Sequence, residues 1–154
     1  MSDNQNNTTE SQCSIKADPM LFARLSRLIA TSQSLDDVLQ SILEESVWVC
    51  DAIRGFLAIV DYDRGELDAH YTAGEGWSEE KRLGRLKISE KTGKGITSHV
   101  AATALPYRAD DVSVDPYYIQ FFDDVKSEVA VPLVDSFQRI RGVLNIESDE
   151  LTHF

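Results

Sequence analysis

The chain has 154 residues, contains 15 Lys and Arg against 26 Asp and Glu, and carries a formal charge of −11. Hydrophobic residues make up 42% of it, enough for a buried core in a chain whose length fits one domain. The acidic excess argues against binding to nucleic acid or to an anionic membrane, because both require clustered Lys and Arg. There is neither a signal peptide nor an apolar run near the ~18–20 residues of a membrane span, so we expect a cytoplasmic protein.

Residues 1–17 form a polar leader rich in Asn, Ser, Thr and Gln, with almost nothing to bury. We expect this leader to be disordered and residues 18–154 to form the folded domain. The two cysteines, Cys13 and Cys50, form no Cys-x-x-Cys pair, so the sequence predicts neither a disulfide framework nor a structural zinc site. This cysteine usage is typical of a reducing compartment.

Two helices are predicted at the start of the domain. Asp18 is a suitable N-cap for the first, and Pro19 suits its first helical position. Ser34 is predicted to cap the second helix, with Asp37 at the capping-box position and an apolar stripe that extends to about Cys50. The apolar stripe of the first helix consists of Leu21, Leu25, Leu28 and Ile29.

The apolar spacing then changes from helical to extended. Residues 54–60 are a nearly continuous apolar run, typical of a strand covered on both faces. Residues 61–65 have turn chemistry and lead into an alternating segment, so we expect a hairpin. A third short strand is predicted around residues 86–88. On the second strand the residues predicted to share one face are Leu67, Ala69 and Tyr71.

A glycine-rich segment, residues 93–95, leads into a short predicted helix that ends at Leu105-Pro106. Residues 107–126 follow as a long irregular segment, with one helical turn expected after Asp115-Pro116. Long loops in compact domains are usually functional or disordered. This segment is too aromatic for a disordered linker, so we expect it to fold over the domain. Its aromatic residues are Tyr107, Tyr117, Tyr118, Phe121 and Phe122.

Two strands, residues 128–134 and 139–147, end the predicted domain. Each places its apolar residues on one face, which leaves Glu128 and Asn145 on the opposite face. The element order predicts an α+β domain with a central, mainly antiparallel sheet of five to six strands. The apolar residues that share a face are Val129, Val131 and Leu133 on one strand, and Ile140, Gly142, Leu144 and Ile146 on the other.

From about residue 21 to residue 148 the chain resembles a GAF domain, a small-molecule sensing module of signalling proteins. The resemblance implies long helices on one face of the sheet, and a short helix and long loop that enclose a pocket on the other. It also implies a non-catalytic regulatory sensor that signals to an attached output domain. The motifs on which the resemblance rests are, in chain order, Leu35-x-x-Val38-Leu39, Gly93-Lys94-Gly95-Ile96, Val100-Ala101-x-Thr103, Pro106-Tyr107-x-Ala109-Asp110-Asp111-Val112, Ser127–Leu133 and Gly142–Ser148.

Members of this family usually continue into a final helix beside the first one. We therefore expect the C-terminal helix to be truncated here, and an output domain to lie beyond residue 154. The missing helix would leave apolar surface on the first two helices, which favours a homodimer through these N-terminal helices.

The resemblance and the residue types predict a mainly apolar pocket with a few polar groups. The alternative is that the aromatic side chains fill a closed core, in which case the domain is a dimerisation module with a degenerate pocket. Asp110 also has a simpler interpretation, as a cap for loop amides. The candidate ligand-binding residues are Phe56, Ala58, Trp77, Ile88, Ile96, His99, Tyr107, Asp110, Tyr117, Tyr118, Phe121, Glu128, Ala130 and Asn145.

Several chemistries are disfavoured. No cysteine lies between Asp51 and Phe154, whereas bilin-binding members and members that reduce free methionine sulfoxide need pocket cysteines. The residues show no nucleophile–base set and no calcium-loop spacing, so we expect neither an enzyme nor a metal site. The ligand and any cofactor stay unidentified. Residues 108–128 hold six acids against Arg108 and Lys126, which favours a neutral or cationic ligand unless Lys94 or Arg108 receives an anion.

Overall fold

The computed structural model describes residues 19–32, 34–82 and 84–154. The predicted leader, residues 1–17, and the predicted N-cap Asp18 lie outside the described residues. The chain divides into two units, residues 1–31 and 32–154, which are described separately. Helix α1, Pro19–Thr31, belongs to the first unit and exposes Phe22 and Ile29. None of the described helices is long and apolar enough to cross a membrane.

Helix α2, Leu35–Val49, is the first element of the second unit, and it is the second helix that the sequence predicts. The Ser34 amide donates to Asp37 Oδ2 and the Asp37 amide donates to Ser34 Oγ, both at 3.1 Å. These two bonds form the predicted capping box, which satisfies amides that have no partner within the helix.

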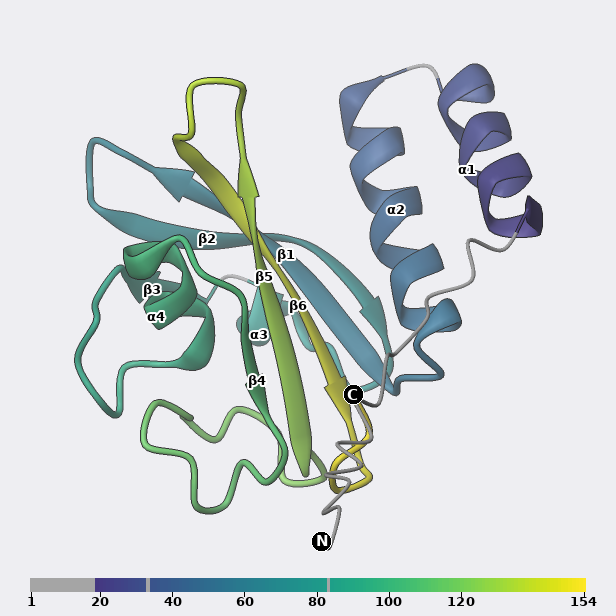
Figure 1. Ribbon diagram of the computed structural model, residues 1–154. Helices are drawn as coiled ribbons and strands as arrows, with labels where there is room; N and C mark the ends of the chain where they lie inside the picture. The colour runs from purple at the N-terminus through teal and green to yellow at the C-terminus, as the bar shows by residue number, and fades with distance from the viewer. Residues whose placement is uncertain (1–18, 33, 83) are drawn as a thin grey trace, which may run out of the picture. The chain divides into compact units, whose positions relative to one another are not determined.

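Six strands form one antiparallel sheet in the order β3-β2-β1-β6-β5-β4, which confirms the predicted fold class. The sheet is strongly curled, and α2 and α4 lie on opposite sides of it (Figure 1). The strands are β1 Arg54–Asp61, β2 Glu66–Gly74, β3 Arg85–Lys87, β4 Tyr107–Ala109, β5 Ser127–Val134 and β6 Ile140–Ser148; the short helices are α3 Glu79–Arg82 and α4 Ile96–Thr103.

A β-bulge changes the predicted faces of β2. Leu57 pairs with Tyr71 while the next residue, Ala58, pairs with Ala69, so His70 is an extra residue in β2. An extra residue reverses which face the following side chains occupy. Leu67 and Ala69 therefore pack on the α4 side of the sheet, and Tyr71 packs on the α2 side. The prediction that all three share a face was wrong.

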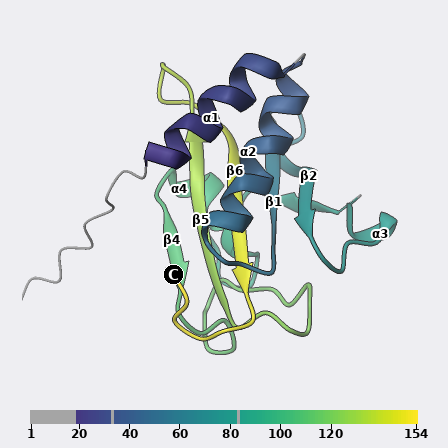
Figure 2. The ribbon, with the colours of Figure 1, turned by 90° about the vertical axis from the view of Figure 1, so that its right-hand side faces the viewer.

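Each face of the sheet has its own core. Beneath α2, the α2-face core consists of the buried side chains Leu43, Val47, Leu57, Ala73 and Ile146. On the opposite face, α4 and the loop between β4 and β5 cover a larger cluster that includes Phe56, Leu67 and Val143. Figure 2 shows α2 in front of the strands and α4 behind them.

The predicted long irregular segment differs from expectation at two places. Its first three residues form β4, which pairs with β5. No helix follows Asp115, because Asp115 Oδ1 accepts the amides of Tyr117 at 2.8 Å and Tyr118 at 3.1 Å in a side-chain-capped turn. The segment does fold over the domain, since Phe122 and Val125 are buried in the core on the α4 side.

Candidate functional site

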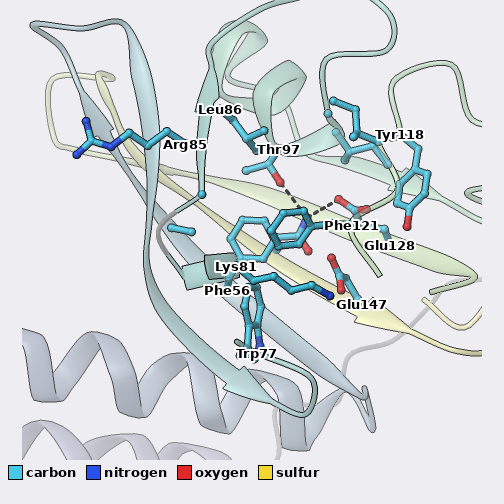
Figure 3. A pocket seen from close by; sticks show the side chains of 16 residues that line it. Phe56, Trp77, Lys81, Arg85, Leu86, Thr97, Tyr118, Phe121, Glu128 and Glu147 are labelled. Carbon is cyan, nitrogen blue, oxygen red and sulfur yellow. Dashed lines mark hydrogen bonds between the residues drawn. The ribbon is translucent and has the colours of Figure 1, made fainter. Parts of the chain in front are cut away.

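A cavity of about 110 Å³ lies on the α4 side of the sheet. Side chains from β1, β2, β5 and β6 reach it from the sheet, and it is bordered by the α3–β3 segment, the start of α4 and residues 118–121 (Figure 3). Its lining residues are Phe56, Ala69, Trp77, Lys81, Gly84, Arg85, Leu86, Gly95, Ile96, Thr97, Tyr118, Ile119, Phe121, Glu128, Asn145 and Glu147.

Half of the fourteen sequence-predicted site residues line this cavity. They come from six separate parts of the chain, which the fold brings together. They are Phe56, Trp77, Ile96, Tyr118, Phe121, Glu128 and Asn145.

The other seven lie elsewhere on or near the same core. Ala58 and Ala130 are buried in it, and Ile88 packs against it. The backbone carbonyl of Asp110 accepts the amide of Thr152 at 2.9 Å, outside the cavity.

His99, Tyr107 and Tyr117 form a separate ring cluster. His99 stacks on Tyr117 at 3.8 Å between ring centres, and Tyr107 meets both rings edge-on. The Tyr107 hydroxyl donates to Asp115 Oδ2 at 2.8 Å. Burial and the hydrogen bond to Asp115 raise the pKa of Tyr107 to about 12. This cluster holds the loop against α4 and does not line the cavity.

Several lining residues were missed by sequence reasoning. Glu147 lies two positions after Asn145, so strand alternation could have placed it on the same face. Thr97 follows the predicted Ile96 on α4. Lys81 and Gly84 belong to a short polar segment whose pattern carried no signal for a pocket.

Three buried polar side chains of the sheet, Glu128, Asn145 and Glu147, line the cavity, and Thr97 of α4 lies against them. Asn145 Nδ2 donates to Thr97 Oγ1 at 2.9 Å and also to Glu128 Oε1. Glu128 and Glu147 are each only 4% exposed. Asn145 Oδ1 and Glu147 Oε2 are buried and have no hydrogen-bond partner among the described residues. Such buried atoms are rare in native proteins, because each costs about 1–3 kcal/mol.

The two buried carboxyl groups have raised pKa values. Burial raises the pKa of Glu128 well above 4.5, the nearby charges of Glu147 and Asp115 add to this, and the hydrogen bond from Asn145 opposes it. Burial also raises the pKa of Glu147, to about 7. The charge of Arg54 opposes this second increase.

Arg54 links β1 to the loop beside the cavity. Its guanidinium donates to Asp124 Oδ1 at 2.7 Å and to Oδ2, and it lies 3.9 Å from the centre of the Phe122 ring. This hydrogen-bonded pair lowers the pKa of Asp124. Lys81 Nζ lies 3.6 Å from the centre of the same ring. Both cations therefore stack on Phe122, at the edge of the cavity.

The opposite wall of the cavity is aromatic. The Trp77 ring meets Phe56 edge-on at 5.8 Å and lies 6.3 Å from Phe121. Trp77 Nε1 donates to the carbonyl of Ala73 at 3.0 Å, which fixes the ring's orientation. Burial, together with the two carboxyl groups, raises the pKa of Tyr118 to about 12. The arrangement can hold a small molecule between apolar ring faces and a polar base.

Cys50 is the cysteine that lies within the described residues. Cys50 follows α2 and packs against the α2-face core, and it does not line the cavity. No group of three or more His, Cys, Asp or Glu side chains in the described ranges could hold a metal ion.

The sequence model of the GAF domain matches residues 32–154, and the chain belongs to this family. The GAF domain is a regulatory or sensor fold of signalling proteins, and the predicted resemblance is confirmed. No curated protein matches the chain.

Solved structures of similar fold include two GAF proteins and an enzyme. The GAF domain of a phosphoenolpyruvate-protein phosphotransferase from Coxiella burnetii has a TM-score of 0.72 and 19% identity, over 86% of this chain and 77% of that one. A putative GAF sensor protein from Burkholderia vietnamiensis has a TM-score of 0.72 and 20% identity, over 88% and 80%. The free methionine-R-sulfoxide reductase from Neisseria meningitidis has a TM-score of 0.72 and 19% identity, over 88% and 77%. At these identities the likeness shows the fold alone.

Proposed function

We propose that this GAF domain is a non-catalytic sensor that binds a small molecule in the cavity. Binding is coupled to a change in an attached output domain. The observation that carries the proposal is the pair of buried acceptor atoms, Asn145 Oδ1 and Glu147 Oε2, on residues that line the cavity. Buried polar atoms in native proteins normally have partners, so a ligand that donates to these two atoms would remove their cost.

The geometry of β6 supports one route of signalling. Asn145 lines the cavity, whereas its neighbour Ile146 packs beneath α2 on the other face of β6. A ligand that draws Tyr118 and Phe121 inward would move the loop and the strands together. Helix α2 would respond because it rests on those strands.

We further propose that the protein forms a homodimer through its N-terminal helices in the cytoplasm. Phe22 and Ile29 on α1, and Leu35 on α2, are largely exposed apolar side chains. Exposed apolar surface of this kind favours association. In this arrangement the output domain receives its signal through the helices.

The second candidate function is a structural dimerisation module whose pocket is degenerate. The observation in its favour is the size of the cavity, since about 110 Å³ is well below the ~300–1,000 Å³ of common ligand sites. An enzyme like the similar reductase is the weaker candidate. Cys50 lies away from the cavity, and Cys13 lies outside the described residues.

Native mass spectrometry of the protein purified from its own host tests the proposal. We expect an adduct of at most a few hundred daltons and a dimer mass. Ala69→Leu places a larger side chain in the cavity wall and should remove the adduct, whereas the exposed Ala30→Leu should keep it. Leu28→Asp should yield monomers. The absence of any adduct from the unmodified protein would favour the dimerisation module.

A further inference from the structure

We propose that the cavity binds a small organic cation, an alkylammonium or guanidinium compound of a few carbon atoms, through Glu128, Asn145 and Glu147. This inference rests on the proposed function, because it names the ligand class of the same cavity.

The atoms left unpaired at the cavity are hydrogen-bond acceptors. Asn145 uses both hydrogens of its amide, one toward Thr97 and one toward Glu128, so only its acceptor Oδ1 is left. The unpaired atom of Glu147, Oε2, is also an acceptor when the carboxyl group is ionised. An anion would place oxygen against oxygen here. A ligand rich in N–H groups satisfies both atoms.

The balance of charge at the cavity also favours a cation. Among the ion pairs of the described residues none includes Glu128, and only the Asn145 amide stabilises its charged form. Arg54 is already paired with Asp124. Figure 3 shows Arg85 pointing away from Glu128 and Glu147. A carboxyl group buried in this way must take up a proton or acquire a cationic partner, and the ligand is that partner.

The shape and chemistry of the cavity walls favour the same ligand class. Phe56, Trp77 and Phe121 present aromatic rings to the cavity, and Tyr118 lies near the two carboxyl groups (Figure 3). Aromatic rings attract cations through their negative faces, and desolvation strengthens the attraction. The volume of about 110 Å³ is roughly four times the ~30 Å³ that one water occupies in the liquid. The cavity therefore suits a handful of non-hydrogen atoms.

Lys81 competes with a cationic ligand for the carboxyl group of Glu147. Its side chain reaches the neighbourhood of Glu147 in Figure 3, and its charge lowers the pKa of that group. If the ligand is a cation, Lys81 repels it and removal of the Lys81 charge strengthens binding. If the ligand is an anion, the same removal weakens binding. Removal of the Lys81 charge also raises the pKa of Glu147, so the comparison is made well above pH 7, where Glu147 is ionised in both proteins. There Lys81→Gln separates the two ligand classes by the sign of its effect.

The test uses three probes of similar size and different charge: propylammonium, 1-propanol and propionate. Each is titrated into the ¹⁵N-labelled protein at pH 7.5 and constant ionic strength, and the amide signals of Thr97, Glu128 and Asn145 are followed by NMR. We expect propylammonium to bind at least about tenfold more tightly than 1-propanol, since hydrogen bonds to charged groups are the stronger ones. Propionate should leave these signals unchanged.

Matched variants locate the effect. Glu128→Gln keeps the shape of the side chain but removes its charge, and it should lower the affinity for propylammonium at least about tenfold. Glu147→Gln is a second variant, for which we expect the same loss. Glu90→Gln, an exposed residue outside the cavity, should change nothing. The affinity for propylammonium should rise from pH 6 to pH 8, because Glu128 and Glu147 must both lose a proton to bind a cation. The charged groups that act on Glu128 are Glu147 and Asp115, and those that act on Glu147 are Arg54, Asp124 and Lys81.

The outcomes are distinct from those of the proposed function. Equal or tighter binding of propionate or 1-propanol, unchanged affinity in both Gln variants, or no binding of propylammonium would overturn the cation assignment. The presence or absence of an adduct in native mass spectrometry would still decide whether the domain is a sensor. A cation-selective response that is lost in both Gln variants and strengthened by Lys81→Gln would establish the ligand class.

Discussion

The two faces of the one sheet differ in what they bury. Beneath α2 the buried side chains are apolar, with Leu43 and Leu57 almost completely inaccessible. On the other face, Glu128, Asn145 and Glu147 are as deeply buried but are polar. Consecutive residues of the same strands supply both environments, since side chains alternate along a strand. One face is built for stability, and the other has the unpaired polar atoms that a ligand can use.

This difference has an energetic consequence. Unpaired polar atoms and buried carboxyl groups each cost free energy, so the cavity face contributes less to folding than its area suggests. The apolar packing beneath α2 must offset that cost. Functional sites commonly depart from optimal packing in this way. Two measurements test whether the two faces differ as described, and a third tests the cap of the helix that covers the apolar face.

The largest effect is expected from Leu43→Ala in the α2-face core. Leu43 is 0% exposed, so the change leaves a cavity and should lower the free energy of unfolding by about 2–5 kcal/mol. Phe121→Ala, on the cavity face, removes a side chain that is 44% exposed and should cost clearly less. Urea denaturation of both variants gives the comparison. Equal losses would show that the faces do not differ in this respect.

The second effect is a change in the pH dependence of stability with Glu147→Gln. The pKa of Glu147 is about 7 in the folded state, above its ordinary 4.5, so the folded protein holds a proton that the unfolded chain has released. Its contribution to stability is therefore fully present below pH 4.5 and is lost as pH rises through about 7. Relative to the Gln variant, the natural protein should lose about 3 kcal/mol between pH 4.5 and pH 8.

Denaturation series at several pH values measure this difference directly. Glu90→Gln is the matched control, because Glu90 is exposed and its replacement should shift stability by no more than about 0.5 kcal/mol at any pH. A difference between Glu147→Gln and the natural protein that stays constant with pH would contradict the raised pKa of Glu147.

The smallest effect is expected at the capping box of α2. Ser34→Ala removes the acceptor for the Asp37 amide and should cost about 1 kcal/mol. Ser41→Ala, inside the same helix, should be neutral or slightly stabilising, because Ala has the higher helix propensity. Thermal unfolding of the two variants measures both. A loss as large for Ser41 as for Ser34 would mean that the cap contributes nothing specific.

Local patterns predicted much of the fold. The capping box of α2, the strands β5 and β6, and the placement of Glu128 and Asn145 away from the α2 face all follow from residue spacing. Two misses have clear causes. The bulge at His70 reverses which side of the sheet the side chains of β2 occupy, and no local feature of the sequence indicated this bulge. Asp115 caps a turn where a helical turn was predicted, since its side chain competes for the same amides.

The candidate site was predictable only in part for a related reason. Seven lining residues could be named from strand alternation and from the family resemblance. Lys81 and Gly84 could not, because α3 reaches the cavity through long-range packing rather than through any pattern of its own. The pair of Arg54 with Asp124 joins residues that are 70 positions apart.

The sequence by itself determined the alternation that gives this sheet one apolar and one partly polar face, and the family to which the chain belongs. Those properties depend on the types of neighbouring residues and on the spacing of apolar residues along the chain, and both are visible in the sequence. The tertiary structure alone decided that Glu128 and Glu147 are buried together beside a cavity. Their raised pKa values and unpaired atoms depend on desolvation and on distant charges, which exist only once the segments have packed.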